Sequence, residues 1–389
     1  MNQTVCTRSI PFGRPWISEE DRQAVARVLS GHILTHGPEC EAFENEFAHF
    51  MGPDAHCVTV SSGMAALHLA YLHFDIGPGD EVIVPAMTHV ATAHAVEWVG
   101  ARPVFVDCDA SNGNLTAEAI FQAIGPKTRA ISVVHFQGIP CEMPEIVKLA
   151  QAHDLKVIED CALAVGGRHS DKHVGLFGDA ACFSFYPVKH LTAGEGGMFA
   201  TRHKDVATAV ARLRAFGVDR RHDERKVPGM YDVVELGLNY RMSELQAALG
   251  RSQLSRVDEI LKLRKDNFDH LRDGLQSLPN IKVLESKDPS INNACYALTM
   301  VLTGATCDQR NEFICRLKEA GIGTSVYYPQ PVPRMKYYAN RYGYDPAKYP
   351  QAIAIADNSI ALPVGPHITL EDIDTIIYHV QEVYRELDS

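Results

Sequence analysis

Lys189 is the residue in this sequence whose setting best suits covalent chemistry. It follows the apolar run Phe183-Ser184-Phe185 and precedes the glycine-rich turn Gly194-Glu195-Gly196-Gly197. A lysine amine forms a covalent imine with an aldehyde, and burial against an apolar wall keeps that amine reactive. Most lysines are instead solvated surface charges, so the prediction of a cofactor anchor depends on the neighbouring motifs.

Two carboxylates, Glu159 and Asp160, end the apolar run Val157-Ile158 upstream of this lysine. The pattern is typical of a buried parallel strand that reaches the carboxyl edge of its sheet, where ligands bind in α/β proteins. Asp160 is therefore the candidate for an acid that faces the cofactor. The alternative is that both carboxylates only cap a following helix.

The segment Val60-Ser61-Ser62-Gly63-Met64 joins an apolar strand to a helix-forming run. Small residues let the backbone approach a ligand closely, and the free amides and positive dipole end of a helix suit a phosphate. Ser184 could give a hydroxyl to the same phosphate. The alternatives are an ordinary capped helix start for this segment and a polar niche filled by Ser184.

Together these motifs resemble the sugar aminotransferases of the DegT/DnrJ/EryC1/StrS family. These are pyridoxal 5'-phosphate (PLP) enzymes of the aspartate aminotransferase fold, fold type I. The resemblance covers nearly the whole chain, from Ile10-Pro11-Phe12-Gly13-Arg14-Pro15 to Leu362-Pro363. It is specific because Glu159-Asp160, Phe183-Ser184-Phe185, Lys189 and the glycine-rich turn occur in that order.

The resemblance implies a role for each of these residues. Lys189 matches the Schiff-base lysine, and Asp160 matches the acid that keeps the pyridine nitrogen protonated so that the ring accepts electrons. Ser184, Gly63 and Met64 match the phosphate cup. Lys189 and Asp160 are thus the implied catalytic residues, and all five are implied to bind the cofactor.

Two further cofactor-binding residues are implied. Asn239 matches an asparagine that reaches the phosphate from the neighbouring subunit, so a homodimer with shared active sites is expected. His89 stands where the family usually has an aromatic ring stacked on the cofactor, and an imidazole can stack as well. The alternative for His89 is a hydrogen-bonded histidine near the sheet edge.

Four positions depart from the family pattern. Leu163 replaces a glutamine that usually contacts the phenolic oxygen of the cofactor, so that contact is lost or supplied by another group. Met64 replaces the usual threonine, and its backbone amide remains available. Tyr327 and Pro333 stand where histidines are common. The sequence therefore predicts an unusual substrate pocket.

The implied activity is a transamination, with L-glutamate as the usual donor and a keto or aldehyde sugar, often nucleotide-linked, as the acceptor. The product would be an amino sugar for a cell-surface polysaccharide or a secondary metabolite. The alternatives are a transaminase for a cyclitol or a sugar acid without a nucleotide, a PLP sugar dehydratase, and a non-catalytic regulatory homologue. Lys189 argues against the dehydratase, whose branch has histidine there. The determinants of the sugar are expected in Arg14–Pro38, Gly217–Met230 and Tyr327–Tyr338.

Apolar runs that alternate with helical patterns predict the fold class, an α/β protein with a seven-stranded, mostly parallel sheet. The runs are Cys57–Val60, Glu81–Pro85, Pro103–Asp107, Ala130–His135, Lys156–Asp160, Ala181–Phe185 and Met198–Thr201. We expect an N-terminal arm and a large PLP-binding domain over residues 1–255. A smaller C-terminal α/β domain over residues 256–389 would hold strands near Ile281–Leu284 and Ala297–Leu302, a helix at Cys307–Ala320 and a final helix after Thr369.

Composition argues against some partners. The chain has 389 residues, 46% hydrophobic content and a net charge of -11, and a negative surface repels nucleic acid and anionic membranes. The basic cluster Arg220–Lys226 is interrupted by acids. It is either a solvated loop or a cluster that gathers around an anionic substrate.

The distribution of cysteines and histidines predicts a cytoplasmic protein without a metal. The ten cysteines include no C-x-x-C pair, so free thiols in a reducing compartment are the simplest interpretation. The eighteen histidines form no metal-binding motif. No apolar stretch approaches the length needed to cross a bilayer.

Overall fold

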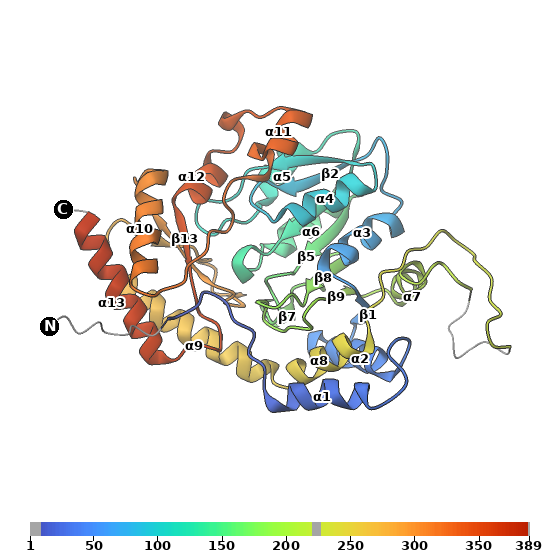
Figure 1. The fold of residues 1–389 in the computed structure, drawn as a ribbon. Coiled ribbons are helices and arrows are strands. Elements are labelled where there is room, and N and C mark those ends of the chain that lie inside the picture. The colour runs from blue at the N-terminus through green and yellow to red at the C-terminus, as the bar shows by residue number, and fades with distance from the viewer. Residues whose placement is uncertain (1–8, 220–226, 388–389) are drawn as a thin grey trace.

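The computed structural model describes residues 9–219 and 227–387 (Figure 1). The basic cluster at 220–226 lies outside the described residues. A seven-stranded sheet forms the centre of the protein, in the order β1-β9-β8-β5-β4-β2-β3. Its strands are β1 (His56–Val60), β2 (Glu81–Pro85), β3 (Arg102–Val106), β4 (Thr128–Val134), β5 (Lys156–Asp160), β8 (Ala180–Ser184) and β9 (Gly197–Thr201).

The predicted seven-stranded, mostly parallel sheet is confirmed. Neighbours from β3 to β8 are all parallel, and only β9 runs antiparallel to both β8 and β1. Each strand lies within two residues of the run expected from the sequence. The parallel strands are buried on both faces, which explains their continuous apolar runs.

Helices cover both faces of this sheet, and thirteen α-helices occur in the described residues. They are α1 (Glu19–Leu29), α2 (Pro38–Met51), α3 (Gly63–His73), α4 (Val90–Trp98), α5 (Ala117–Ala123), α6 (Met143–Ala152), α7 (Lys204–Leu213), α8 (Glu244–Leu254), α9 (Val257–Leu275), α10 (Cys307–Glu319), α11 (Lys336–Tyr342), α12 (Pro350–Asn358) and α13 (Leu370–Leu387). The described residues also include three short 3-10 helices, η1 (Phe136–Gly138), η3 (Val332–Arg334) and η4 (Pro346–Lys348).

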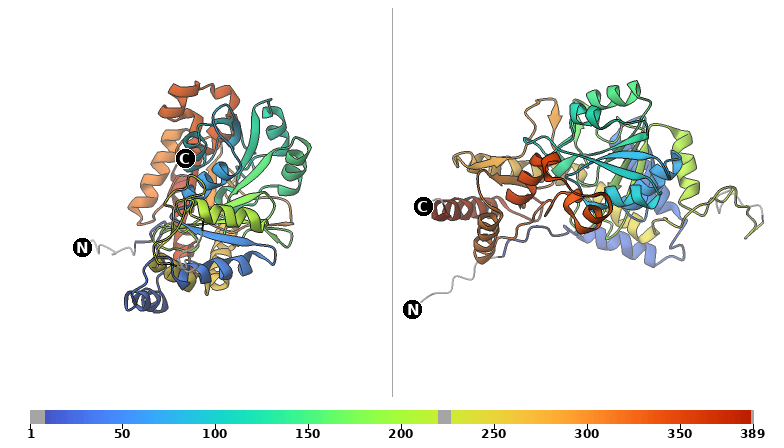
Figure 2. Two further views of the ribbon diagram at one scale, coloured as in Figure 1. Left: turned by 90° about the vertical axis from the view of Figure 1, so that its right-hand side faces the viewer. Right: turned by 90° about the horizontal axis from the view of Figure 1, so that it is seen from above.

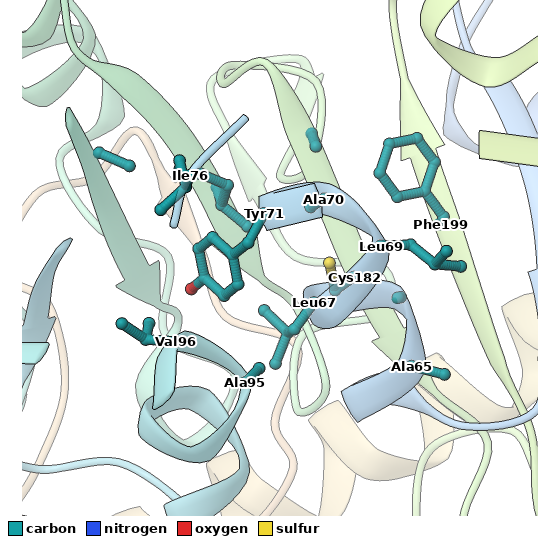
Figure 3. Packing of buried hydrophobic residues seen from close by; sticks show 14 of the residues in the cluster. Ala65, Leu67, Leu69, Ala70, Tyr71, Ile76, Ala95, Val96, Cys182 and Phe199 are labelled. Atoms are coloured by element: carbon teal, nitrogen blue, oxygen red, sulfur yellow. The ribbon is translucent and has the colours of Figure 1, made fainter. Parts of the chain in front are cut away.

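The core on one face of the sheet is built from α3, α4 and α7. Apolar side chains of α3 pack over β8 and β9, and Figure 3 shows Leu69 beside the ring of Phe199. The buried Tyr71 hydroxyl donates to Ser132 Oγ over 3.0 Å. This packing fixes α3 against the sheet, so the start of the helix has a defined place at the sheet edge.

A three-stranded antiparallel sheet, β10 (Ile281–Val283), β12 (Leu298–Leu302) and β13 (Ser359–Leu362), forms a second centre. Helices α9, α10 and α13 pack on it and lie far from the arm beyond α7 (Figure 1). A further small sheet joins β11 (Ile291–Asn292), β6 (Arg168–His169) and β7 (Lys172–His173). Since Ile10 pairs with Ile322, the N-terminal segment reaches the second centre, and the domain boundary at residue 255 stays a prediction.

An extended arm that includes residues 227–237 projects from the body beyond α7, as Figure 1 and the right-hand view of Figure 2 show. Its base is held by pairing of Val218 with Val233. No helix in residues 9–219 and 227–387 combines the length and apolar character of a membrane span.

Candidate active site

The predicted site residues meet where parallel strands end. Asp160 ends β5 and Ser184 ends the neighbouring parallel strand β8. Ile158 and Cys182 belong to the core on the α3 and α4 face. Because side chains alternate along a strand, Asp160 and Ser184 face that same side. The starts of α3 and α4 lie on it too.

Asp160 is buried and held in one orientation. Its Oδ2 accepts a hydrogen bond from Thr92 Oγ1 over 2.8 Å, and its Oδ1 accepts one from the Ala162 amide over 3.1 Å. Thr92 itself lies 2.8 Å from Thr88 Oγ1. The segment after Asp160 forms turns, so the alternative in which it caps a following helix is wrong.

Glu159 points to the opposite face of the sheet and has a different function. Its carboxylate accepts hydrogen bonds from the amides of Gly175, Phe177 and Gly178, and lies 3.1 Å from His135 Nε2. These contacts fix the loop before β8. Of the two carboxylates, only that of Asp160 therefore lies at the site. His135, Glu159 and Cys161 also lie close enough to share an ion, but the predicted lack of a metal stays a prediction.

Lys189 lies in the turn after β8 with a half-buried side chain. Burial lowers the pKa of its amine from the usual range to about 8, while the nearby Asp160 carboxylate acts in the opposite direction. The amine lies 5.4 Å from the ring centroid of Tyr296. It is therefore neutral in a large fraction of molecules near pH 8, as a nucleophilic amine must be.

The start of α3 forms a cradle with free amides. Ser62 caps the helix by accepting a hydrogen bond from the Ala65 amide over 3.1 Å. Among the described residues, no acceptor pairs with the amides of Gly63 or Met64. A Cβ on Gly63 would lie 3.0 Å from Ser184 Cβ. The alternative of a capped helix start is thus observed. The same helix start also leaves two free amides beside Ser184, and these suit a phosphate.

His89 and Asn239 have side chains that are exposed. His89 Nδ1 accepts a hydrogen bond from the Ala91 amide over 3.2 Å, so the hydrogen-bonded alternative is realised, and its stacking role stays a prediction. Burial and the Lys189 charge lower the pKa of His89, which Asp160 opposes. Asn239 Oδ1 accepts from Arg241 Nε over 3.1 Å. The next residue, Tyr240, accepts from the Ser61 amide before α3.

Two of the four departures from the family pattern, Leu163 and Tyr327, lie beside Tyr296. Leu163 is buried in one apolar cluster with Tyr296. The hydroxyl of Tyr327 lies 2.9 Å from the hydroxyl of Tyr296, and Pro333 is buried in η3. At the position where the family commonly has a histidine, this protein thus has Tyr327, paired with Tyr296.

Three residues near the site were not identified from the sequence. Thr92 holds Asp160, and Tyr296 contacts Lys189. Gln137 accepts a hydrogen bond from the Tyr296 amide over 3.3 Å with its backbone oxygen, and its buried side-chain amide has no partner among the described residues. Thr92 lies in α4 and bonds Asp160 of a distant strand, so no local sequence pattern marked it. Tyr296 and Gln137 come close to the site only through the tertiary fold.

Three comparisons with known proteins agree with this geometry. Residues 15–381 match the DegT/DnrJ/EryC1/StrS aminotransferase family. The chain is 35% identical over 381 residues to GDP-perosamine synthase of Escherichia coli O157:H7, covering 97% of this chain and 99% of that one. It is also 35% identical over 383 residues to the spore coat polysaccharide biosynthesis protein SpsC of Bacillus subtilis, covering 97% and 98%.

A solved structure from Streptococcus pneumoniae, in its PLP form, superimposes with a TM-score of 0.90 and 30% sequence identity over 98% of this chain and 100% of that one. The fold, the cofactor and the reaction class follow from these matches together with the site. The chain belongs to the DegT/DnrJ/EryC1/StrS aminotransferase family and is a PLP-dependent sugar aminotransferase of amino sugar biosynthesis.

Proposed function

We propose that Lys189 is the covalent anchor of PLP and that Asp160 pairs with the ring nitrogen of the cofactor. The observation that carries this proposal is the shared edge at which both lie, with a lysine amine of lowered pKa, a buried and oriented carboxylate, and the start of α3. Gly63, Met64 and Ser184 would hold the phosphate, and His89 would stack on the ring. The donor set therefore fits the cofactor.

When bound, PLP supplies a ring that accepts electrons from the substrate carbon as its proton is removed. Asp160 keeps the ring nitrogen protonated, because a buried carboxylate strongly favours a cation beside it. Hydrogen bonds from Thr92 and the Ala162 amide hold that carboxylate in one orientation. The Lys189 amine, once freed by the donor, would take the proton from the substrate carbon and pass it on to the cofactor, since an amine with a pKa of about 8 can accept and donate a proton near neutral pH.

We further propose that L-glutamate is the amino donor and that the acceptor is a keto or aldehyde sugar linked to a nucleotide. The similarity to GDP-perosamine synthase, whose name contains a nucleotide sugar, supports this acceptor. The similarity to SpsC supports a product for a surface polysaccharide. A cyclitol or a free sugar acid remains the alternative acceptor.

We propose a homodimer in which Asn239 of the partner subunit completes the phosphate site. Large apolar side chains of the arm are exposed, which is unfavourable for an isolated subunit and typical of an interface. They include Met230, Tyr231, Val233, Val234 and Leu236, with Leu236 94% exposed.

A cytoplasmic location is also proposed. The nine cysteines in the described residues are free thiols, as a reducing compartment would keep them.

The acceptor is tested by incubating the pyridoxamine form of the protein with a panel of keto sugars, each with and without its nucleotide. Return of the aldehyde form of the cofactor, followed by absorbance, identifies the acceptor. We expect return only with nucleotide-linked sugars. Return with free sugar acids or cyclitols alone would overturn the nucleotide assignment, and no return with any sugar would overturn the acceptor class.

A further inference from the structure

We propose that a small cationic pocket beside Lys189 binds a carboxylate of the amino donor. The pocket lies between the N-terminal segment, the turn that carries Lys189 and the second structural centre. Residues that line it include Gly13, Arg14, Val188, Arg264, Tyr296 and His367. This inference rests on the proposed function, because it assigns a subsite to the donor of that reaction.

Arg264 of α9 is the central observation. Its side chain is only 5% exposed, and its Nη1 donates to the backbone oxygen of Tyr296 over 2.9 Å. Its Nε has no hydrogen-bond partner in the described residues, and no described carboxylate contributes to its pKa, which burial lowers to about 10. A buried cation without a counter-ion is costly, so a site that holds one is suited to an anion supplied from outside.

The other polar groups of the pocket point to the same ligand charge. Arg14 lies close enough to His367 for its charge to lower the pKa of that imidazole, as does Arg264. His367 Nε2 donates to the Pro11 oxygen over 3.0 Å, and its buried Nδ1 has no partner in residues 9–219 and 227–387. No acidic residue lines the pocket. The lining thus holds two guanidinium groups and one imidazole, and the Asp372 carboxylate, which acts on the pKa of His367 in the opposite direction, is not among the lining residues.

The position of the pocket connects it to the reacting amine. Val188, which lines it, directly precedes Lys189, and a Cβ on Gly13 would lie only 2.9 Å from Val188 Cγ1. The Lys189 amine lies 5.4 Å from the centroid of the Tyr296 ring, and the Arg264 guanidinium lies 5.9 Å from it. Lys189 and Arg264 thus both lie against the ring of Tyr296, which places the pocket next to the reacting amine.

Size and chemistry favour a carboxylate over larger anions. The pocket has a volume of about 10 Å³, which is room for one oxygen atom, so one oxygen of a carboxylate can enter it. A planar carboxylate matches the fork of a guanidinium group. The phosphate of the cofactor has its own proposed place at the start of α3, and the phosphates of a nucleotide-linked sugar are too large for this volume. The carboxylate of the donor is therefore the anion that this pocket suits.

The test compares the holoenzyme with Arg14→Gln, Arg264→Met and the control Arg129→Gln. Arg129 is exposed near the start of β4, whereas Asp160 pairs with the last residue of that strand. Glutarate, a dicarboxylate without an amino group, is titrated by calorimetry, so binding is measured without turnover. The concentration dependence of amino transfer from L-glutamate and the KM for the keto sugar are measured on the same proteins.

Loss of a charge-assisted hydrogen bond should weaken glutarate binding and raise the half-saturating L-glutamate concentration by about tenfold or more. Arg129→Gln and the KM for the keto sugar should not change. Arg14 is exposed, so its variant should fold even if Arg264→Met does not.

Equal glutarate affinity in the wild type and Arg14→Gln would refute the pocket assignment. An equal shift in the KM for the keto sugar would assign the pocket to the acceptor. Sulfate binding as tight as that of glutarate would show a general anion site. Either result would refute the assignment of the pocket to the donor carboxylate. A wild-type protein that accepts no amino group from any amino acid would instead refute the proposed function.

Discussion

At the scale of single residues, the sequence indicated the chemical groups but not the residues that orient them. Lys189 and Asp160 were identifiable because both follow apolar strands, and strand ends are where parallel sheets present functional groups. Thr92 and Tyr296 were not, because their contacts with Asp160 and Lys189 join parts of the chain far apart in sequence. Side-chain hydrogen bonds between distant elements leave no periodic pattern.

The lowered pKa of Lys189 predicts the pH dependence of cofactor capture by the apoenzyme. Only the neutral amine attacks an aldehyde, so the rate should rise with pH and level off above about pH 8. The Asp160 carboxylate favours the ammonium form, so Asp160→Asn should move the midpoint to lower pH. Stopped-flow absorbance measures both profiles. A wild-type midpoint near that of free lysine, about 10.4, or an upward shift in Asp160→Asn, would contradict the assigned electrostatics.

Thr92→Val tests the orientation of Asp160. The valine removes the donor to a buried oxygen, so the free energy of unfolding should fall by about 1–3 kcal/mol, and kcat should fall more than the KM for L-glutamate changes. Urea denaturation and steady-state kinetics measure these effects. Thr208→Val, at an exposed threonine of α7 that bonds only its own helix, is the matched control. Equal behaviour of the two variants would rule out a positioning role for Thr92.

At the scale of secondary structure elements, strong periodic or apolar signals were reliable and short elements were not. The seven large-sheet strands and helices α10 and α13 follow the predicted patterns. Strand β13 was missed because it has four residues directly after α12, and its pairing partner β12 lies far away in sequence. Helices α11 and α12 were missed because each is shorter than ten residues and prolines interrupt that region.

The close approach of α3 to β8 predicts the effect of Gly63→Ala. A Cβ there would lie 3.0 Å from Ser184 Cβ and 3.3 Å from the Phe183 oxygen, so the helix start must shift by a few tenths of an ångström. Overpacking of about 1–3 kcal/mol should weaken PLP binding by tenfold or more, as measured by titration of the apoenzyme.

Gly125→Ala provides the control for this experiment. A Cβ at Gly125 would have no neighbour closer than 3.9 Å, so PLP affinity should be unchanged. If Gly63→Ala bound PLP as tightly as Gly125→Ala, the phosphate would lie elsewhere than the start of α3.

At the scale of the whole molecule, the structure holds one chain, so the homodimer is a proposal. The sequence suggested a dimer only through the resemblance at Asn239, because no local pattern encodes which surfaces of two copies meet. The structure adds the projecting arm, which the right-hand view of Figure 2 shows. The large apolar side chains of this arm are exposed. The basic cluster at 220–226, which was expected to be a loop or a substrate contact, lies outside the described residues.

Shared sites predict complementation between two inactive variants. Lys189→Ala lacks the anchor and Asn239→Ala lacks the contact made across the interface, so each alone should lose most activity. After the two are unfolded and refolded together, mixed dimers carry one site with both residues intact, and activity should partly return. Sedimentation checks the dimer. No recovery in a proven mixed dimer would place Asn239 in the site of its own subunit.

The central claim is the covalent link between PLP and Lys189, and borohydride reduction tests it most directly. Reduction converts the imine of the cofactor-loaded protein into a stable amine, and peptide mass spectrometry then locates the label. We predict a single pyridoxyl label on Lys189 and none on the Lys189→Ala protein. A label on a different lysine, or none on Lys189 in fully loaded protein, would contradict the account.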